Sequence, residues 1–261
     1  MKLSIITVNL NNHDGLQKTI DSVVAQTFKD FEWIVIDGGS TDGSKELIEQ
    51  YADHFAYWVS EPDKGIYNAM NKGIRMAKGD YLQFLNSGDW LASSTVLQDV
   101  FNANPTADFV YGDHIESDGS IEAGPNPLTF QRMYRSTICH QDVFHSKRLF
   151  EECQYDENYR IVSDWKFIFE GVVRRKGTYQ KINVVVSGLE KGTSYDVSCL
   201  SEERDVVLKN LYSPIELEAI EEYLQMKESS WYPDLLFLES HKGLFRWIKR
   251  IVRAYKRLCR C

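Results

Sequence analysis

Three aspartates in this sequence stand where carboxylates could do chemistry. Asp37 and Asp89 each follow a short apolar run, and Asp164 opens an amphipathic stretch. A carboxylate can accept hydrogen bonds from a ligand, hold a divalent cation, or take a proton as a general base. Thr7 and Asn9 end the first apolar run and add further polar groups. These residue types predict a polar ligand site that uses several of these functions.

The elements that must position these residues alternate between strands and helices. Strands are predicted at Leu3–Val8, Phe31–Ile36, Ala56–Ser60, Tyr81–Leu85, Asp108–Asp113 and Ile182–Val186, and helices at Leu16–Ala25, Ser44–Tyr51, Ile66–Ala77, Thr95–Asn104 and Asp164–Val173. This order predicts an α/β fold with a doubly wound, mostly parallel, Rossmann-like sheet, followed by C-terminal helices. Ligands of such sheets bind at the carboxyl ends of the strands, where the polar residues are found.

Phosphate-binding signatures are missing from these strand ends. Neither GxGxxG nor GxxxxGK[ST] follows a predicted strand. The sequence therefore argues against a dinucleotide-binding protein and against a P-loop nucleotide-binding protein. A different kind of ligand is predicted at this edge of the sheet.

An ordered set of motifs resembles a known family. The opening Ser-Ile-Ile-Thr-Val-Asn, the segment Asp-Gly-Gly-Ser-Thr-Asp-Gly after the second strand, Asp89 and Ser-Asp-Trp at 163–165 resemble the family 2 glycosyltransferases. Glu-Pro-Asp-Lys-Gly-Ile-Tyr-Asn-Ala-Met-Asn-Lys-Gly-Ile and Phe-Leu-Asn-Ser-Gly-Asp resemble the subgroup that builds bacterial surface polysaccharides. The resemblance covers about residues 1–190 and implies a GT-A fold and inverting transfer of a sugar from a nucleotide donor.

The resemblance assigns a role to each aspartate. Asp164 corresponds to the base that deprotonates the acceptor, and Asp89 to the metal ligand for Mn²⁺ or Mg²⁺, at the end of a reduced Asp-x-Asp motif. Asp37, with Thr7 and Asn9, would form the nucleotide pocket. Each Asp also has a plainer interpretation, because Asp favours turns and the first turn of helices. We favour the plainer interpretation for Ser40 and Asp42 of the loop after Asp37.

Two further segments are candidate binding sites. The donor side would include Asp63, Asn68, Asn71 and Lys72, although an ordinary charged helix surface explains Lys72 equally well. The acceptor side would include His140, Gln141 and Trp165, where His140 could equally be a core histidine.

Composition places the chain among ordinary globular proteins. It has 261 residues, 43% of them hydrophobic and 26% charged, and no apolar run long enough to span a bilayer. Five scattered cysteines predict neither disulfides nor structural zinc. The first residues lack a signal-peptide pattern, so a cytoplasmic location is expected.

The charge is concentrated in an unusual way. Residues 241–261 contain eight Lys or Arg and no acid, and the other 240 residues carry 22 bases against 38 acids. The apolar residues of this tail recur at helical spacing, which predicts an amphipathic helix on an anionic membrane. A dimerisation helix would carry acids, and a nucleic-acid surface suits an acidic body poorly.

The predicted organisation has three parts. A glycosyltransferase domain spans 1–200, with a nucleotide-sugar half at about 1–115 and an acceptor half at about 116–200. A helical extension at 201–240 and the membrane-docking helix at 241–261 follow. The predicted function is transfer from a nucleotide-sugar, expected to be UDP-linked, to a lipid-linked saccharide in cell-surface polysaccharide biosynthesis. The expected location is the inner face of the cell membrane. A sugar nucleotidyltransferase and a non-catalytic carbohydrate-binding protein are the alternatives.

Overall fold

A computed structural model describes residues 1–189, 197–230, 232–233, 236–237 and 249–250. The chain divides into two compact units, Met1–Asp205 and Val206–Cys261. Of the predicted membrane-docking helix at 241–261, only Lys249 and Arg250 are among the described residues. No helix in these ranges is long and apolar enough to cross a membrane.

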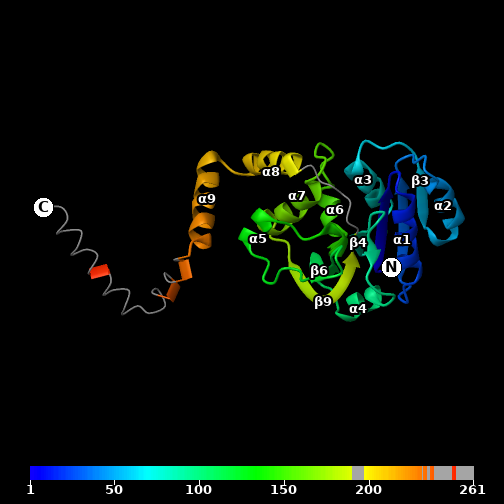
Figure 1. Ribbon diagram of the computed structural model, residues 1–261, viewed down its shortest axis with the longest axis horizontal. Coiled ribbons are helices and arrows are strands. Elements are labelled where there is room, and N and C mark those ends of the chain that lie inside the picture. The colour runs from blue at the N-terminus through cyan, green and yellow to red at the C-terminus, as the bar shows by residue number, and fades with distance from the viewer. Residues whose placement is uncertain (190–196, 231, 234–235, 238–248, 251–261) are drawn as a thin grey trace. The chain divides into compact units, whose positions relative to one another are not determined.

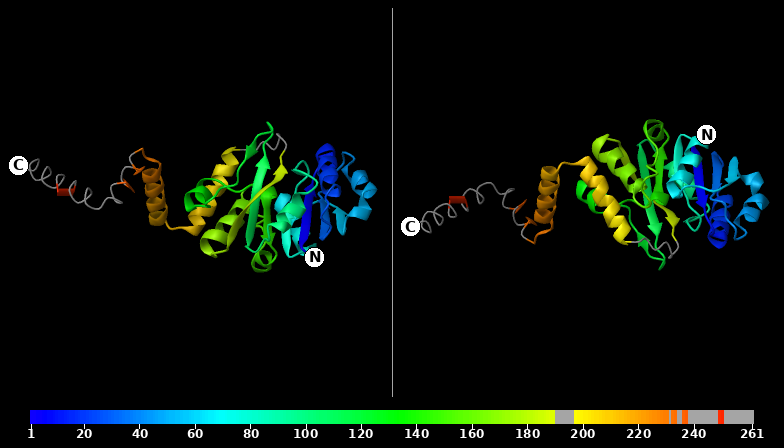
Figure 2. Two further views of the ribbon diagram at one scale, coloured as in Figure 1. Left: turned by 90° about the horizontal axis from the view of Figure 1, so that it is seen from below. Right: turned by 90° about the horizontal axis from the view of Figure 1, so that it is seen from above.

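The first unit is built on one mixed sheet (Figures 1 and 2). Its strands are β1 Leu3–Asn9, β2 Phe31–Asp37, β3 Tyr57–Ser60, β4 Tyr81–Phe84, β5 Trp90–Leu91, β6 Phe109–Ile115, β7 Ile121–Glu122, β8 Val143–Ser146 and β9 Tyr179–Gly188. The order is β3-β2-β1-β4-β8-β6-β9-β5, with β7 paired to β6. The amino-terminal half, β3-β2-β1-β4, is parallel throughout, whereas β8 runs antiparallel to both of its neighbours.

Helices lie between the strands along the chain, and further helices come after the last strand. They are α1 His13–Val24, α2 Ser44–Gln50, α3 Ile66–Met76, α4 Val96–Asn102, α5 Phe130–Arg135, α6 Arg148–Glu152, α7 Ser163–Phe169, α8 Val197–Leu211 and α9 Pro214–Glu228, with 3-10 turns at Ala52–His54 and His140–Asp142. The helix predicted over Asp164–Val173 ends as an α-helix at Phe169 and continues as a π-helical turn, Glu170–Arg174. Within that turn, a Cβ on Gly171 would lie 2.5 Å from Phe109, so glycine permits the close packing.

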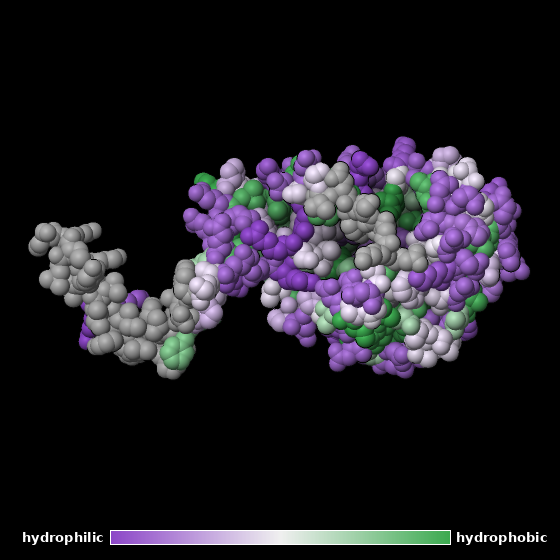
Figure 3. All heavy atoms as spheres, viewed as in Figure 1, coloured by the Kyte–Doolittle hydropathy of each residue, from purple (hydrophilic) through white to green (hydrophobic). Residues whose placement is uncertain are grey.

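Alternation of side chains along the strands divides the core into two layers. Leu3 and Ile5 of β1 belong to a cluster with residues of α1, α2 and α4. Across the sheet, α3 packs against β1 and β2, and Gly73 of α3 lies directly over Ile6. A second, aromatic cluster surrounds His145 with the rings of Phe84, Phe109, Phe150 and Phe167, and Tyr155 packs against Phe167. The face shown in Figure 3 is mostly hydrophilic, with hydrophobic side chains in small patches.

The strand directions gather the polar loops at one edge of the sheet. β1, β2 and β4 are parallel, so the segments after Asn9, Asp37 and Phe84 leave at that edge. Because β8 is antiparallel to β4, the turn His140–Asp142 that precedes β8 lies at the same edge. The fold therefore places His140 beside the loop that carries Asp89.

Candidate active site

A cleft of about 750 Å³ opens at this edge. Its lining includes Tyr67, Asn86, Asp89, His140, Arg160 and Asp164. Asp89, His140 and Asp164 are candidate site residues from the sequence. Gln141, a fourth such candidate, lines the same cleft. Arg160 supplies the one Lys or Arg among the lining residues that the structure describes.

Asp164 lies in the first turn of α7, with its side chain 18% exposed. Its Oδ1 accepts hydrogen bonds from the Tyr67 hydroxyl at 2.8 Å and the Trp165 backbone N–H at 2.8 Å. Its Oδ2 lies 3.5 Å from His140 Nδ1. Burial acts to raise the pKa of the carboxyl, but His140, Tyr67 and the Trp165 amide outweigh it and lower the pKa of Asp164. Asp164 is therefore ionised at neutral pH and able to accept a proton.

His140 stands between the two aspartates of the cleft. Its Nε2 lies 3.8 Å from Asp89 Oδ2, and its Nδ1 faces Asp164. Burial lowers the pKa of an imidazole, but the two carboxylates have the larger effect and raise the pKa of His140. Burial also raises the pKa of Asp89 to about 6, against the attraction of His140. The three side chains thus form one electrostatically coupled group.

The segment Asn86–Asp89 carries oxygen atoms suited to a hard cation. The side-chain amide of Asn86 lies 2.9 Å from His140 Nε2 and lines the same cleft as Asp89. Carboxylate and amide oxygens are ligands that Mg²⁺ and Mn²⁺ accept. The residues present therefore fit a divalent cation held by Asp89 and Asn86.

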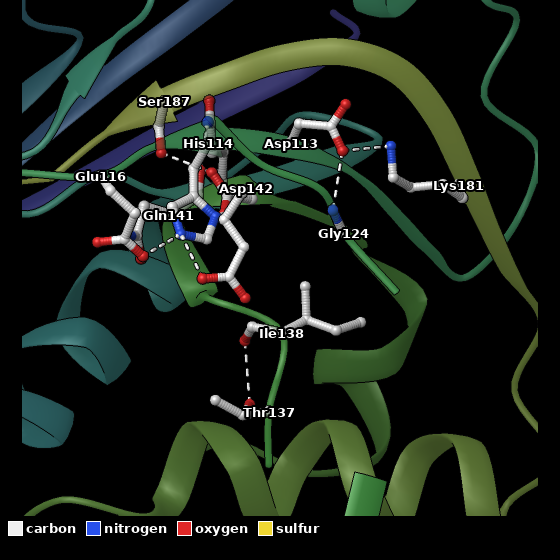
Figure 4. A network of polar contacts seen from close by, with 12 residues as sticks. Asp113, His114, Glu116, Gly124, Thr137, Ile138, Gln141, Asp142, Lys181 and Ser187 are labelled. Atoms are coloured by element: carbon white, nitrogen blue, oxygen red, sulfur yellow. Dashed lines mark hydrogen bonds and ion pairs between the residues drawn. The ribbon is translucent and has the colours of Figure 1, made fainter. Parts of the chain in front are cut away.

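A buried network surrounds Asp142, the residue after Gln141 (Figure 4). His114 Nδ1 lies 2.9 Å from Asp142 Oδ2, and the Ser187 hydroxyl donates to Asp142 Oδ1 at 2.6 Å. Glu116 Oε1 lies 3.0 Å from His114 Nε2. The hydrogen bond to Asp142 is the largest of the effects that raise the pKa of His114 to about 9. Asp142 follows Gln141 directly, so this ion-paired network fixes the segment that presents His140.

Two further groups of side chains have the composition of a metal site. One contains His114, Cys139 and Asp142, and the other His114, Glu116 and Glu122. Both depend on His114, whose two ring nitrogens already face Asp142 and Glu116. Burial also raises the pKa of the Cys139 thiol. A protonated His114 between carboxylates accounts for these groups.

Asp37 is fully buried, and its carboxylate organises the loop after β2. It accepts hydrogen bonds from Asn9 Nδ2 at 2.8 Å, from Ser40 Oγ at 2.5 Å and from Ser60 Oγ at 2.6 Å. Burial acts to raise the pKa of this carboxyl, but the hydrogen bonds lower it overall. Asn9 keeps its buried Oδ1 unpartnered. Asp37 therefore positions backbone at the edge of the sheet, and Asn9 Oδ1 is a free acceptor there.

The other predicted donor-side residues connect α3 to neighbouring loops. Asn68 and Asn71 both donate to the Glu157 carboxylate at 2.8 Å, and Lys72 pairs with Glu61 at 2.8 Å. Asp63 Oδ1 accepts from the Gly65 N–H at 2.8 Å. None of the four predicted side chains is among the residues that line the cleft. Their described contacts hold the loops around α3 in place.

Thr7 and Trp165 lie in the core, away from the cleft lining. The Thr7 hydroxyl accepts a hydrogen bond from the Trp33 indole at 3.0 Å. The Trp165 indole donates to Met133 O at 2.8 Å, and Arg204 stacks over its ring at 4.4 Å. Both polar groups thus have partners inside the protein, and neither residue is among those that line the cleft.

Several cleft residues were not predicted from the sequence. Asn86 lies in the reduced Asp-x-Asp segment, where its amide group is the sequence signal. Tyr67 belongs to the Gly-Ile-Tyr-Asn segment, whose asparagine is the more obvious polar ligand from sequence alone. Arg160 has no local signal, because it precedes Asp164 in an irregular loop.

Comparison with solved structures identifies the fold class. A structure of Staphylococcus aureus TarS, residues 1–349 in complex with UDP-GlcNAc, gives a TM-score of 0.63 at 18% identity, covering 76% of this chain and 61% of that chain. A mannosyltransferase from Pyrobaculum calidifontis in complex with GDP-Man and Mn²⁺ gives 0.58 at 18% identity, covering 74% and 58%. The architecture is thus the α/β fold of GT-A glycosyltransferases.

Sequence comparison identifies the family. The glycosyl transferase family 2 profile matches residues 4–154, more than half of the chain. A PGL/p-HBAD biosynthesis glycosyltransferase of Mycobacterium bovis is 33% identical over 171 residues, covering 63% of this chain and 67% of the relative. An uncharacterized glycosyltransferase of Mycobacterium tuberculosis is 34% identical over 181 residues, covering 66% and 69%. This chain belongs to glycosyl transferase family 2, and it is a glycosyltransferase.

Proposed function

We propose that the protein transfers a sugar, with inversion, from a UDP-sugar to a lipid-linked saccharide during cell-surface polysaccharide synthesis. The observation that carries the proposal is one cleft in which His140 connects the ionised Asp164 with Asp89. The UDP-GlcNAc complex of TarS supports the donor class, and the similarity to a PGL/p-HBAD biosynthesis glycosyltransferase supports a role in a biosynthetic transfer.

Asp164 is the general base of the proposed reaction. Its carboxylate takes the proton of the acceptor hydroxyl while that oxygen forms a bond to C1 of the sugar. The bond between C1 and the diphosphate oxygen breaks on the opposite face, and its electron pair leaves with the nucleoside diphosphate. Tyr67 and His140 hold the carboxylate toward the cleft through Oδ1 and Oδ2 respectively.

A divalent cation, when bound by Asp89 and Asn86, would neutralise charge on the departing diphosphate. The chain adds Arg160 at the same cleft, where its guanidinium can stabilise an anionic part of the substrates. His140 and Gln141 line the acceptor side. The loop that Asp37 organises, with Asn9 Oδ1, supplies the nucleotide pocket, and Asp63 lies next to it, because a Cβ on Gly38 would be 2.6 Å from Asp63 Oδ2.

The membrane location is part of the proposal. A lipid-linked acceptor requires the enzyme to work at a bilayer surface, and the basic, amphipathic sequence of residues 241–261 suits docking on anionic lipid at its cytoplasmic face. Retention of the full chain on phosphatidylglycerol vesicles, and its loss from a variant with all eight tail bases changed to Gln, is the expected result. Equal retention of both proteins would contradict the docking role.

Substitution of Asp164 by Asn tests the base. Asp164→Asn should reduce transfer from UDP-GlcNAc, UDP-glucose or UDP-galactose to a polyprenyl-diphosphate-linked saccharide by at least about 10²-fold, because an amide cannot take the proton. Binding of UDP with Mn²⁺, measured by thermal shift, should be unchanged. Asp53→Asn, an exposed substitution outside the cleft, is the matched control. A fully active Asn variant would rule out the assignment.

Substitution of Asp89 tests the cation site. For the wild type, UDP should raise the melting temperature more with Mn²⁺ than with EDTA, because the cation adds a bond between protein and diphosphate. In Asp89→Ala this difference should disappear. If the variant keeps the full Mn²⁺-dependent increase, the cation is held elsewhere.

A further inference from the structure

The segment before α7 is held by a carboxylate from a distant part of the chain. Glu203 of α8 accepts a hydrogen bond from the backbone N–H of Arg160 at 2.7 Å through Oε1. Its Oε2 accepts from the N–H groups of Ile161 and Val162 at 2.9 and 3.2 Å. These three N–H groups come immediately before α7, and Val162, the residue at its N-cap, offers no capping side chain. Glu203 therefore accepts hydrogen bonds from three backbone N–H groups for which the neighbouring sequence supplies no capping side chain.

The same segment is connected to the catalytic carboxylate. The Tyr67 hydroxyl is 2.5 Å from the backbone O of Ile161 and 2.8 Å from Asp164 Oδ1. The Tyr67 hydroxyl has a single hydrogen, which is shared between the backbone O of Ile161 and Asp164 Oδ1. The position of Ile161, held by Glu203, therefore sets how much of this hydrogen bond Asp164 receives.

Arg204, the next residue of α8, holds a second element near Asp164. Its guanidinium donates to the backbone O atoms of Tyr134, Arg135 and Ser136, at the end of α5, at 3.1–3.2 Å. It also lies over the ring of Trp165. Two adjacent residues of opposite charge therefore tie α8 to the start of α7 and the end of α5.

We propose that Glu203 is a positioning residue for the transfer reaction, which sets Asp164 in the cleft through the backbone of residues 160–162. The inference rests on the proposed role of Asp164 as the base. It gives α8 a function in catalysis, although α8 contributes no side chain to the cleft lining among the described residues. Misplacement of a reacting group by about 1 Å can reduce a rate about 10²-fold. Loss of the Glu203 hydrogen bonds should therefore lower kcat more than it weakens substrate binding.

The test compares Glu203→Gln, Glu203→Ala and Glu202→Gln in the full chain. Glu202 is an exposed neighbour on the same helix and gives the matched control. The Gln variant keeps one of the two acceptor oxygens, and the Ala variant keeps none. We expect kcat for UDP-GlcNAc-dependent transfer, or for the best of the three UDP-sugars, to fall about tenfold in the Gln variant and about 10²-fold in the Ala variant. The KM for the UDP-sugar should stay within about twofold.

Two further readouts separate positioning from a general loss of structure. Backbone amide exchange at residues 160–162 should become faster in both Glu203 variants, while exchange in β1 and β4 stays as in the wild type. The acid limb of the kcat profile should move, because the share of the Tyr67 hydrogen bond that lowers the pKa of Asp164 depends on the position of Ile161. Faster exchange at 160–162 with an unchanged kcat and acid limb would overturn the inference. Inactivity of the wild type with every UDP-sugar would instead contradict the proposed function.

Discussion

His140 couples the two functional carboxylates of the cleft. It faces Asp164 with one ring nitrogen and Asp89 with the other, at 3.5 and 3.8 Å. Its positive charge lowers the pKa of both carboxyls, and burial acts in the opposite direction. A cation at Asp89 would take over this role toward that carboxylate and would repel a protonated His140.

Replacement of His140 by Asn should therefore change the pH dependence of the reaction. The pKa of Asp164 lies below its usual value partly because of His140, so it should rise in the variant. Asp164 works as a base only when ionised, and the acid limb of the kcat profile should move to higher pH. His13→Asn, outside the cleft lining, should leave the limb in place. An unmoved limb in the His140 variant would show that the two side chains are not coupled.

At the scale of elements, the position of α3 depends on one glycine. Gly73 faces β1, and a Cβ there would lie 2.5 Å from Ile6 Cγ2. α3 carries Tyr67, Asn68 and Asn71, which contact Asp164 and the loop before α7. The close contact of α3 with the sheet therefore sets the distance between the Tyr67 hydroxyl and the Asp164 carboxylate.

Gly73→Ala should destabilise the protein by about 1–3 kcal/mol, the usual cost of overpacking a core. The conflict is with the γ2 methyl group of Ile6, which leucine lacks. In an Ile6→Leu background, the same change should therefore cost less, as measured by urea unfolding. Equal costs in the two backgrounds would show that the contact is not the cause.

At the scale of the whole molecule, the first compact unit contains a buried histidine in its core. His145 is fully buried inside an aromatic cluster, and neither ring nitrogen has a hydrogen-bond partner. Burial lowers its pKa from 6.5 to about 3. The unfolded chain binds a proton more readily than the folded chain, so this group reduces stability as the pH falls below about 6.5.

His145→Phe should remove this part of the pH dependence. Between pH 7.5 and 5.5 the wild type should lose about 1.4 kcal/mol more unfolding free energy than the variant, which corresponds to about one pKa unit. Chemical denaturation at the two pH values measures the difference. His54→Phe, a change of an exposed histidine, should behave as the wild type. A His145 variant with the wild-type loss would mean that the ring is protonated in the folded state.

The sequence by itself predicted the alternating strands and helices, the α/β sheet and the family. These follow from short-range patterns, because apolar runs that end in polar residues mark buried strands and the loops that leave them. That Asp89 and Asp164 lie at the cleft could be predicted for the same reason, since each stands at the end or start of an element. Thr7 could not be placed correctly, because β1 is buried on both faces and its apolar run does not show which way a side chain points.

Only the tertiary structure decided which polar groups meet. The antiparallel insertion of β8 between β4 and β6 brings His140 to Asp89, and α8 brings Glu203 to the backbone before Asp164. The tertiary structure also places Trp165 in the core, where Met133 and Arg204 bind it. These contacts join residues about 30 to 50 positions apart. Local patterns do not encode such pairings, because they depend on strand order and helix packing across the whole domain.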